Sequence, residues 1–390
     1  MDNITHSLTG LAIARAGLNR FCPRATLLLI LSANAPDGDV ITALRGPFQY
    51  FEAHRGYSHS LACLPFLAVV PVFLTAAIFR QQLPWIRAWI LSCIGIASHL
   101  LLDCTNSYGV RLFLPFSSRW LHLDWNNLYD VCILLVLVFG AIWPLFARLV
   151  SREIGGQAPL GRGTAVFALT FFLLFDLGRA VLHNRAIAQL ESLLYDDRPP
   201  RRVAALPDSF NPFRWTGVVE TPNAFQLMTV NTRGQVDAEE SQTFYKPEIT
   251  PSLEAVKTDQ RFRYFIYFAR FPVWSESPVI TDRGQATRVQ LTDLRFGRPD
   301  AGSFHCVALV NPDHHLVQSW FTFGSGANLG WGARQRASAL NLLRRHQRLA
   351  DNTAAQLHRI DRVGSGPNRL HRLFRMPPHR TRSAFQSVQN

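Results

Sequence analysis

Long apolar runs separated by short polar connections fill the first 185 residues of the chain and are absent afterwards. A helix needs roughly 20 apolar residues to cross a bilayer. Four runs reach or approach that length, at residues 61–79, 86–102, 131–150 and 165–182. We therefore expect a membrane α-helical bundle with about four full spans.

Two shorter apolar segments precede these runs, at residues 4–18 and 24–35. As helices they would be roughly 18 to 22 Å long, which is short for independent spans. The connection between them contains Pro23, so we expect a short N-terminal helical hairpin. A single span over 25–44 is the alternative. Residues 1–16 lack the regions of a cleaved signal peptide, and we expect them to stay in the protein.

The pattern changes near residue 200, where aromatic and β-branched residues alternate or cluster between Gly, Pro and Asp. This pattern predicts β-strands. We expect a membrane domain at 1–185, a β-rich soluble domain at 200–325 and a basic helical or disordered tail at 326–390. The predicted strands are RFRYFIYFARF (261–271), ATRVQLTDLRF (286–296), FHCVALV (304–310) and HLVQSWFTF (315–323).

Composition supports a protein that is partly in a membrane and partly in water. Hydrophobic residues make up 48% of the chain and charged residues 17%, which excludes a disordered chain. Of the net charge of +13, residues 334–390 contribute +10 through 12 arginines and two aspartates. Aromatic residues in this stretch are limited to Phe374 and Phe385, so we expect the tail to contact anionic lipid headgroups rather than nucleic acid.

Arginines near the ends of the spans predict the orientation, because short cytoplasmic loops are enriched in Arg and Lys. Eight arginines flank one face of the predicted bundle and five flank the other. The difference predicts that the loops at 36–60 and 103–130, and the region after residue 186, are extracytoplasmic.

Histidine and aspartate gather in four clusters within the first 130 residues. Imidazole and carboxylate groups bind zinc or manganese without sulfur ligands. In an apolar helix, residues four apart lie on one face, and Gly56 would allow a tight loop to turn its two histidines inward. The candidate ligands are His6, Asp37 with Asp39, His54 with His59, and His99 with Asp103.

The predicted topology places these clusters on one membrane face, because both hairpin ends and the end of the apolar run at 86–102 lie there. Inserting an ionisable side chain into a membrane segment costs roughly 2.5 to 3.5 kcal/mol of free energy, so such groups normally pair with one another. A helix-terminal polar pair is the alternative for His99 and Asp103. We predict a site for one or two divalent ions, zinc or manganese. Asp124 and Asp130 are either carboxylates that support ligands or helix caps.

The order of these motifs resembles the LexA-binding, inner-membrane-associated metal-dependent hydrolases of bacteria. That family has an N-terminal THxxxG, an acidic PDxD-like turn, an HRGxTHS-type signature, an HxxxD helix and a PF segment. Ser58 replaces the threonine common in the signature and keeps the hydroxyl group. The motifs here are THSLTG (5–10), PDGD (36–39), HRGYSHS (54–60), HLLLD (99–103) and PF (115–116).

The resemblance covers residues 1 to about 185, and the β-rich region looks like the accessory domain of longer members. It implies a metal-dependent hydrolase in the bacterial inner (cytoplasmic) membrane, with several spans. In our leading hypothesis, a metal-activated water attacks a phosphoester or other ester of a small-molecule or lipid-linked substrate. Arg55 would stabilise the developing negative charge, and Asp39 would accept the proton from water if it is not a ligand.

Two other classes of function remain open from the sequence. The same ligands would serve a metal-dependent membrane transporter or sensor, although transporters usually place ligands on broken helices near the bilayer midplane. A membrane-anchored binding protein would use the β-rich domain or the tail. The substrate, the number of ions and the oligomeric state stay open.

Overall fold

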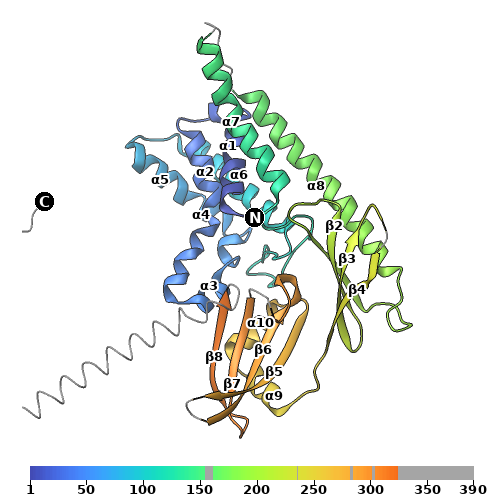
Figure 1. Ribbon diagram of the computed structural model, residues 1–390. Coiled ribbons are helices and arrows are strands. Elements are labelled where there is room, and N and C mark those ends of the chain that lie inside the picture. The colour runs from blue at the N-terminus through green and yellow to red at the C-terminus, as the bar shows by residue number, and fades with distance from the viewer. Residues whose placement is uncertain (154–160, 235, 282–283, 301–303, 324–390) are drawn as a thin grey trace, which may run out of the picture. The chain divides into compact units, whose positions relative to one another are not determined.

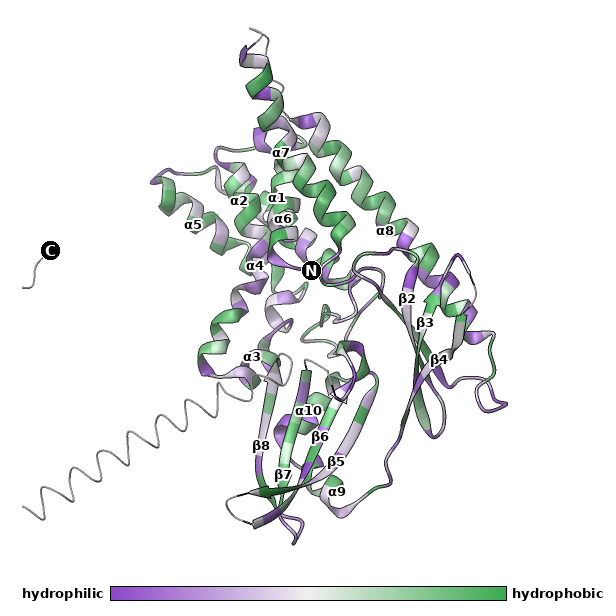
Figure 2. Cartoon of the chain, viewed as in Figure 1, coloured by the Kyte–Doolittle hydropathy of each residue, from purple (hydrophilic) through white to green (hydrophobic). Residues whose placement is uncertain are grey.

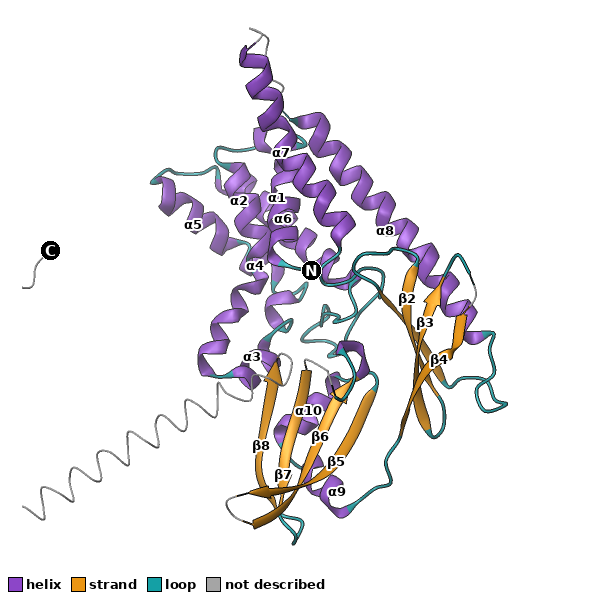
Figure 3. Cartoon of the chain, in the orientation of Figure 1, coloured by secondary structure: helices purple, strands orange, loops and turns teal. Residues whose placement is uncertain are grey.

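The computed structural model describes residues 1–153, 161–234, 236–281, 284–300 and 304–323. The helices of the first half are followed by two four-stranded sheets with short helices between them (Figure 1, Figure 3). This confirms the predicted order of an apolar helical region followed by a β-rich region. The predicted basic tail lies outside the described residues.

The helical region contains eight α-helices and three 3-10 segments among the described residues. They are α1 (Asn3–Arg15), η1 (Leu18–Arg20), α2 (Ala25–Asn34), η2 (Pro36–Arg45), α3 (Pro47–Ala53), η3 (Tyr57–His59), α4 (Leu64–Leu67), α5 (Val69–Phe79), α6 (Trp85–Thr105), α7 (Val131–Glu153) and α8 (Arg162–Glu191).

The β-rich region forms two antiparallel sheets, each in sequence order. The first sheet contains β1 (Arg202–Pro207), β2 (Arg214–Glu220), β3 (Ala224–Asn231) and β4 (Val236–Tyr245). The helices α9 (Pro251–Lys257) and α10 (Gln260–Phe268) follow. The second sheet contains β5 (Pro272–Thr281), β6 (Gly284–Asp293), β7 (Phe304–Val310) and β8 (Leu316–Phe323), with η4 (Leu294–Phe296) after β6.

Among the described residues, three helices, α6, α7 and α8, are long and apolar enough to cross a membrane, and counting two bent helix pairs as spans raises the number to five. Figure 2 shows the apolar residues along these helices. The apolar run at 61–79 forms α4 and α5, which follow each other across Ala68 and together form one arm of a helix pair bent by 93°. Pro65 lies in the first turn of α4, where its missing N–H favours a new helix start. The alternative span at 25–44 is also bent, by 49° between α2 and η2.

The first two helices pack as the predicted hairpin, and α6 packs against its second helix. A Cβ atom at Gly10 would lie 2.7 Å from the Leu29 carbonyl oxygen. A Cβ atom at Gly95 of α6 would lie 2.6 Å from Ser32 Cβ. Glycines let membrane helices approach closely, so α2 is held between α1 and α6.

The prediction of a strand at 261–271 is wrong, because most of this segment forms α10. The Asp259 side chain accepts hydrogen bonds from two backbone N–H groups of the first turn and caps the helix. Phe262, Phe265 and Phe268 recur at a spacing of three and are all buried. This helical spacing buries one face against the second sheet, which outweighs the β propensity of aromatic residues.

Each sheet packs against helices. The C-terminal turns of α8 lie on the first sheet, where Ala186 and Leu190 share a core with Trp215 and Val230. The core of the second sheet contains the phenylalanines of α10 and also Phe51 of α3. The helix that leads directly into the HRGYSHS loop is therefore anchored in the second sheet.

Candidate metal centre

The structure brings all seven predicted donors together. We call this cluster the His/Asp centre. Its residues come from α1, the start of η2, the end of α3 and η3, and the last two turns of α6. The seven residues form three overlapping groups, and within each group the donor atoms lie within 4.8 Å of one another. The groups are His6 with His99 and Asp103, Asp37 with His59 and His99, and Asp37 with Asp39 and His54.

Two imidazoles lie at the middle of the His/Asp centre. The Nε2 atoms of His59 and His99 are 3.1 Å apart. Asp37 Oδ1 is 3.5 Å from the first of these nitrogens and 3.7 Å from the second. Asp103 Oδ2 is 3.5 Å from both. Ligand atoms of a tetrahedral zinc site with bonds of about 2.0 to 2.1 Å are about 3.3 Å apart, so these spacings match a shared ion.

Several polar atoms of the His/Asp centre lack a hydrogen bond with the described residues, although His6 Nε2 lies 3.5 Å from Asp103 Oδ1. His6, His59, His99 and Asp103 are fully buried. Both ring nitrogens of His6 and Oδ2 of Asp103 form no hydrogen bond with any described residue. The His6 ring stacks on His99 with a centroid separation of 3.8 Å. Buried polar atoms are normally satisfied, so this donor set fits a divalent cation, which would fill that need.

Hydrogen bonds fix the orientation of the two central rings. His99 Nδ1 donates to the Ala33 carbonyl oxygen at 2.7 Å when it carries the proton. The Ser58 hydroxyl lies 2.9 Å from His59 Nδ1 and 3.0 Å from Asp39 Oδ2. Partners on Nδ1 leave Nε2 of each ring as the ligand atom, as is usual for metal-binding histidines.

Asp39 and His54 form a pair at the edge of the His/Asp centre. His54 Nδ1 is 3.0 Å from Asp39 Oδ1. Asp39 Oδ2 accepts a hydrogen bond from the Arg55 backbone N–H at 3.2 Å. The side chain of His54 is 15% exposed, whereas the central histidines are fully buried. Asp39 therefore orients His54 and the loop that follows it.

Arg55 is buried and points its guanidinium group at protein oxygens. Its Nη2 donates to Asp103 Oδ1 at 2.9 Å. Its Nη1 donates to Asn106 Oδ1 at 2.9 Å and to the Gly109 carbonyl at 3.1 Å, and the Tyr108 ring lies 4.7 Å away. In this structure Arg55 and the buried N-terminal amine of Met1 both contact Asp103 Oδ1 and orient this carboxylate. Sequence reasoning missed Asn106 and Tyr108, although both follow within five residues of HLLLD.

The two aspartates left open by the sequence lie outside the His/Asp centre. Asp130 caps α7 by accepting hydrogen bonds from the backbone N–H groups of Cys132 and Ile133. Asp124 accepts two hydrogen bonds from Arg270 Nη1, at 2.8 and 2.9 Å. Burial opposes the charge of Asp124, but its contacts with His122 and Arg270 keep the pKa of this carboxyl below its usual range.

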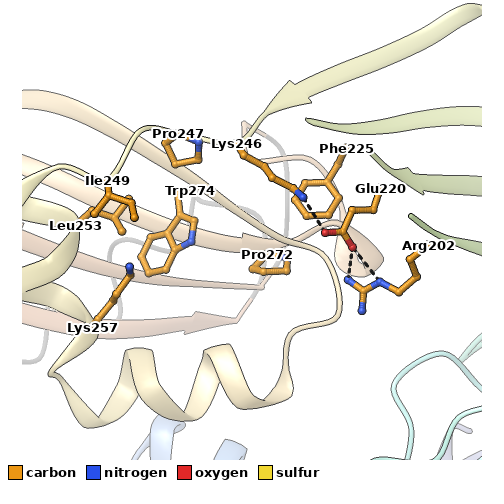
Figure 4. Close-up of a pocket in the computed structure, with 10 residues that line it drawn as sticks. All are labelled: Arg202, Glu220, Phe225, Lys246, Pro247, Ile249, Leu253, Lys257, Pro272 and Trp274. Atoms are coloured by element: carbon orange, nitrogen blue, oxygen red, sulfur yellow. Dashed lines mark hydrogen bonds and ion pairs between the residues drawn. The ribbon is translucent and has the colours of Figure 1, made fainter. Parts of the chain in front are cut away.

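A separate pocket of about 310 Å³ lies among both sheets and α9 (Figure 4). Its charged lining residues are already paired. Glu220 contacts Lys246 at 2.7 Å and Arg202 at 2.8 Å, while Lys257 contacts Glu254 at 2.6 Å. These internal pairs leave the pocket with less reactive chemistry than the His/Asp centre.

Comparison with known proteins agrees with the membrane architecture. Residues 1–186 match the family described as YdjM inner membrane protein. The chain is also 32% identical over 127 residues to Inner membrane protein YbcI of Escherichia coli (strain K12), a match that covers 32% of this chain and 72% of that protein. The chain belongs to the YdjM inner membrane protein family. The YdjM match contains the entire His/Asp centre and ends before the first sheet.

A second relative extends the similarity into the sheets. The chain is 25% identical over 334 residues to a Bacillus subtilis (strain 168) protein named Uncharacterized protein YfhP. That match covers 83% of this chain and 94% of the relative. No solved structure matches the chain. Membership of the YdjM family, together with the apolar helices, supports a membrane location.

Proposed function

We propose that this YdjM family member is an integral membrane metal-dependent hydrolase. The observation that carries the proposal is the arrangement of four donor atoms from His59, His99, Asp37 and Asp103, in which five interatomic spacings lie between 3.1 and 3.7 Å. These spacings are those expected of ligands around one zinc or manganese ion. His6 would complete the ligand set or hold a second ion. When bound, such an ion supplies Lewis acidity and makes water a stronger nucleophile near neutral pH.

His54 is our candidate for proton transfer. When its Nδ1–H donates to Asp39, the other ring nitrogen carries the lone pair and can accept a proton. Asp39 fixes this tautomer and stabilises the protonated ring, as orienting carboxylates do in other hydrolases. This assigns to His54 the proton-accepting role that sequence reasoning gave to Asp39.

The surroundings of the His/Asp centre favour a lipid-linked ester as the substrate. The residues that follow the acidic turn and flank the HRGYSHS loop expose large apolar side chains, which in a membrane protein suit contact with acyl chains. Arg55 is committed to Asp103, so the substrate's polar group would meet the ion and His54. The exposed apolar residues are Val40, Ile41, Leu44, Tyr57 and Leu61.

Metal analysis of the detergent-purified protein tests the proposal, combined with a panel of phosphoester and carboxylester substrates. We expect bound zinc or manganese in the wild type, and loss of the ion together with turnover in His59→Ala and His99→Ala. His54→Gln should keep the ion and lose turnover, because it removes only the proton acceptor. His315→Ala is the matched control, since this exposed histidine lies in a turn of the second sheet.

Three results would contradict the proposal. If the purified wild-type protein contains no bound divalent ion, the proposed metal site is refuted. Full metal content in both His59→Ala and His99→Ala removes these residues from it. A metal-loaded protein that cleaves neither ester class removes the proposed hydrolase activity.

We also propose that the His/Asp centre opens to the extracytoplasmic side of a multi-pass protein. The arginine bias at the span ends supports this orientation. Cysteine labelling with an impermeant reagent in intact cells tests it, using Asn3→Cys, Ala53→Cys and Asp208→Cys in a cysteine-free background. Labelling at all three positions is expected. Protection at all three positions would place the His/Asp centre on the cytoplasmic side. Protection of Asn3→Cys alone would place His6 on the opposite side of the membrane from the other donors.

A further inference from the structure

The β-rich region lies against the loops that orient the His/Asp centre. Phe51, near the end of α3, is fully buried and stacks on Phe321 of β8 with a centroid separation of 4.5 Å. Its edge contacts include Phe268 and Phe304, each at 5.1 Å. The Tyr264 hydroxyl of α10 donates to the Glu52 carbonyl at 3.0 Å. Residues directly before His54 are therefore fixed by the second sheet and α10.

A second connection reaches the loop after α6. Arg295 of η4 is 1% exposed at its side chain and pairs with buried Asp293 at 2.8 Å. It also donates to the Ser107 carbonyl at 2.9 Å and the Tyr108 carbonyl at 3.3 Å. The Tyr108 ring contacts Phe268 of α10 at a centroid separation of 4.9 Å. The β-rich region thus holds this loop by both backbone and ring contacts.

The same loop holds Arg55. Tyr108 covers one face of the Arg55 guanidinium group, while Asn106 and Gly109 accept its hydrogen bonds. Arg55 then donates to Oδ1 of Asp103, whose Oδ2 lies beside both central histidines. Groups that hydrogen-bond to a metal ligand fix its orientation and basicity, and their loss typically lowers metal affinity about 10- to 100-fold.

We infer that the second sheet is a positioning element for the His/Asp centre, with Arg295 acting through Tyr108 and Arg55 on Asp103. This inference rests on the proposed metal site and assigns the β-rich region a role in it. Arg295 is a positioning residue, because its described contacts are with protein groups and none is with a candidate ligand. A simple structural role would affect the stability of the sheet without changing metal affinity.

The test measures the zinc dissociation constant of the full chain in detergent, by competition with a chelator. We expect Arg295→Met and Tyr108→Leu to raise it about 10- to 100-fold, and Arg295→Lys to recover part of the loss. Tyr108→Phe is the matched control, because the Tyr108 hydroxyl has no hydrogen-bond partner among described residues. Arg298→Gln is the second control, since this arginine is 45% exposed at its side chain. Both controls should stay within about threefold of the wild type.

Hydrogen exchange of apo protein separates this inference from the proposed function. Faster exchange in peptides covering 54–60 and 103–109 of Arg295→Met and Tyr108→Leu is expected. Wild-type zinc affinity and wild-type exchange in both variants would overturn the positioning role. If the wild type binds no zinc but the two variants show faster exchange than the wild type, the metal site alone is overturned. If Arg295→Met does not fold, the comparison of Tyr108→Leu with Tyr108→Phe tests the inference.

Discussion

Replacing Phe51 with alanine tests the anchoring of α3 in the second sheet. The ring is fully buried and has aromatic neighbours on several sides, including the stacked Phe321. Truncating a buried phenylalanine to alanine typically costs about 3 to 5 kcal/mol of unfolding free energy. We expect the upper part of this range, because well-placed ring pairs add about 0.5 to 1.5 kcal/mol each beyond simple burial.

Urea unfolding in detergent, followed by tryptophan fluorescence, measures this loss. With a slope of about 2 kcal/mol per molar urea, the midpoint of Phe51→Ala should fall by roughly 2 M. Phe210→Ala is the control, because this side chain is 77% exposed and surface changes usually stay within about 0.5 kcal/mol. The anchoring is refuted if the Phe51→Ala midpoint matches the wild type, or if the control falls equally.

Three further changes test other parts of the structure. Gly95→Leu should cost about 1 to 3 kcal/mol of thermal stability in detergent, because even a Cβ would approach Ser32 within 2.6 Å; an unchanged melting temperature contradicts the close packing. Arg55→Lys should weaken zinc binding, since lysine lacks the forked geometry that contacts Asp103, Asn106 and Gly109 together; an unchanged zinc affinity excludes Arg55 as a positioning residue. Asp124 has a lowered pKa, so its pair with Arg270 stabilises above about pH 3.9 and is lost as pH falls through the folded pKa. Asp124→Asn should therefore lose less stability than the wild type on acidification, and equal losses contradict this.

The helical region could be predicted in large part from apolar run length, because the bilayer sets that length. The errors came where a local feature competed with the general pattern. Pro65 lies in the first turn of α4, so the helix of the apolar run at 61–79 begins only at Leu64. In the β-rich region, the spacing of Phe262, Phe265 and Phe268 indicated a helix, but the aromatic content of the segment favoured a strand.

The donors of the His/Asp centre could be predicted because histidine and aspartate are costly within apolar segments and so stand out. Their grouping followed from topology, which placed four clusters on one face. The partners of Arg55 could not be predicted in the same way. Asn106 and Tyr108 are ordinary loop residues in the sequence, and the contacts of Tyr108 with η4 and α10 join positions more than 150 residues apart.

The length of α8 has a geometric consequence for the first sheet. Its 30 residues span about 45 Å, whereas the hydrocarbon core of a bilayer is about 30 Å thick. A span through the bilayer would therefore leave about 15 Å of α8 outside the hydrocarbon core, and Ala186 and Leu190, near its C-terminal end, pack against the sheet. In such a span, the length of α8 sets the distance of the first sheet from the lipid. Deleting one residue would shorten α8 by only about 1.5 Å but would rotate its C-terminal end by about 100°, which would move Leu190 away from Trp215. Changes in α8 length are therefore compatible with this packing only in near-whole turns.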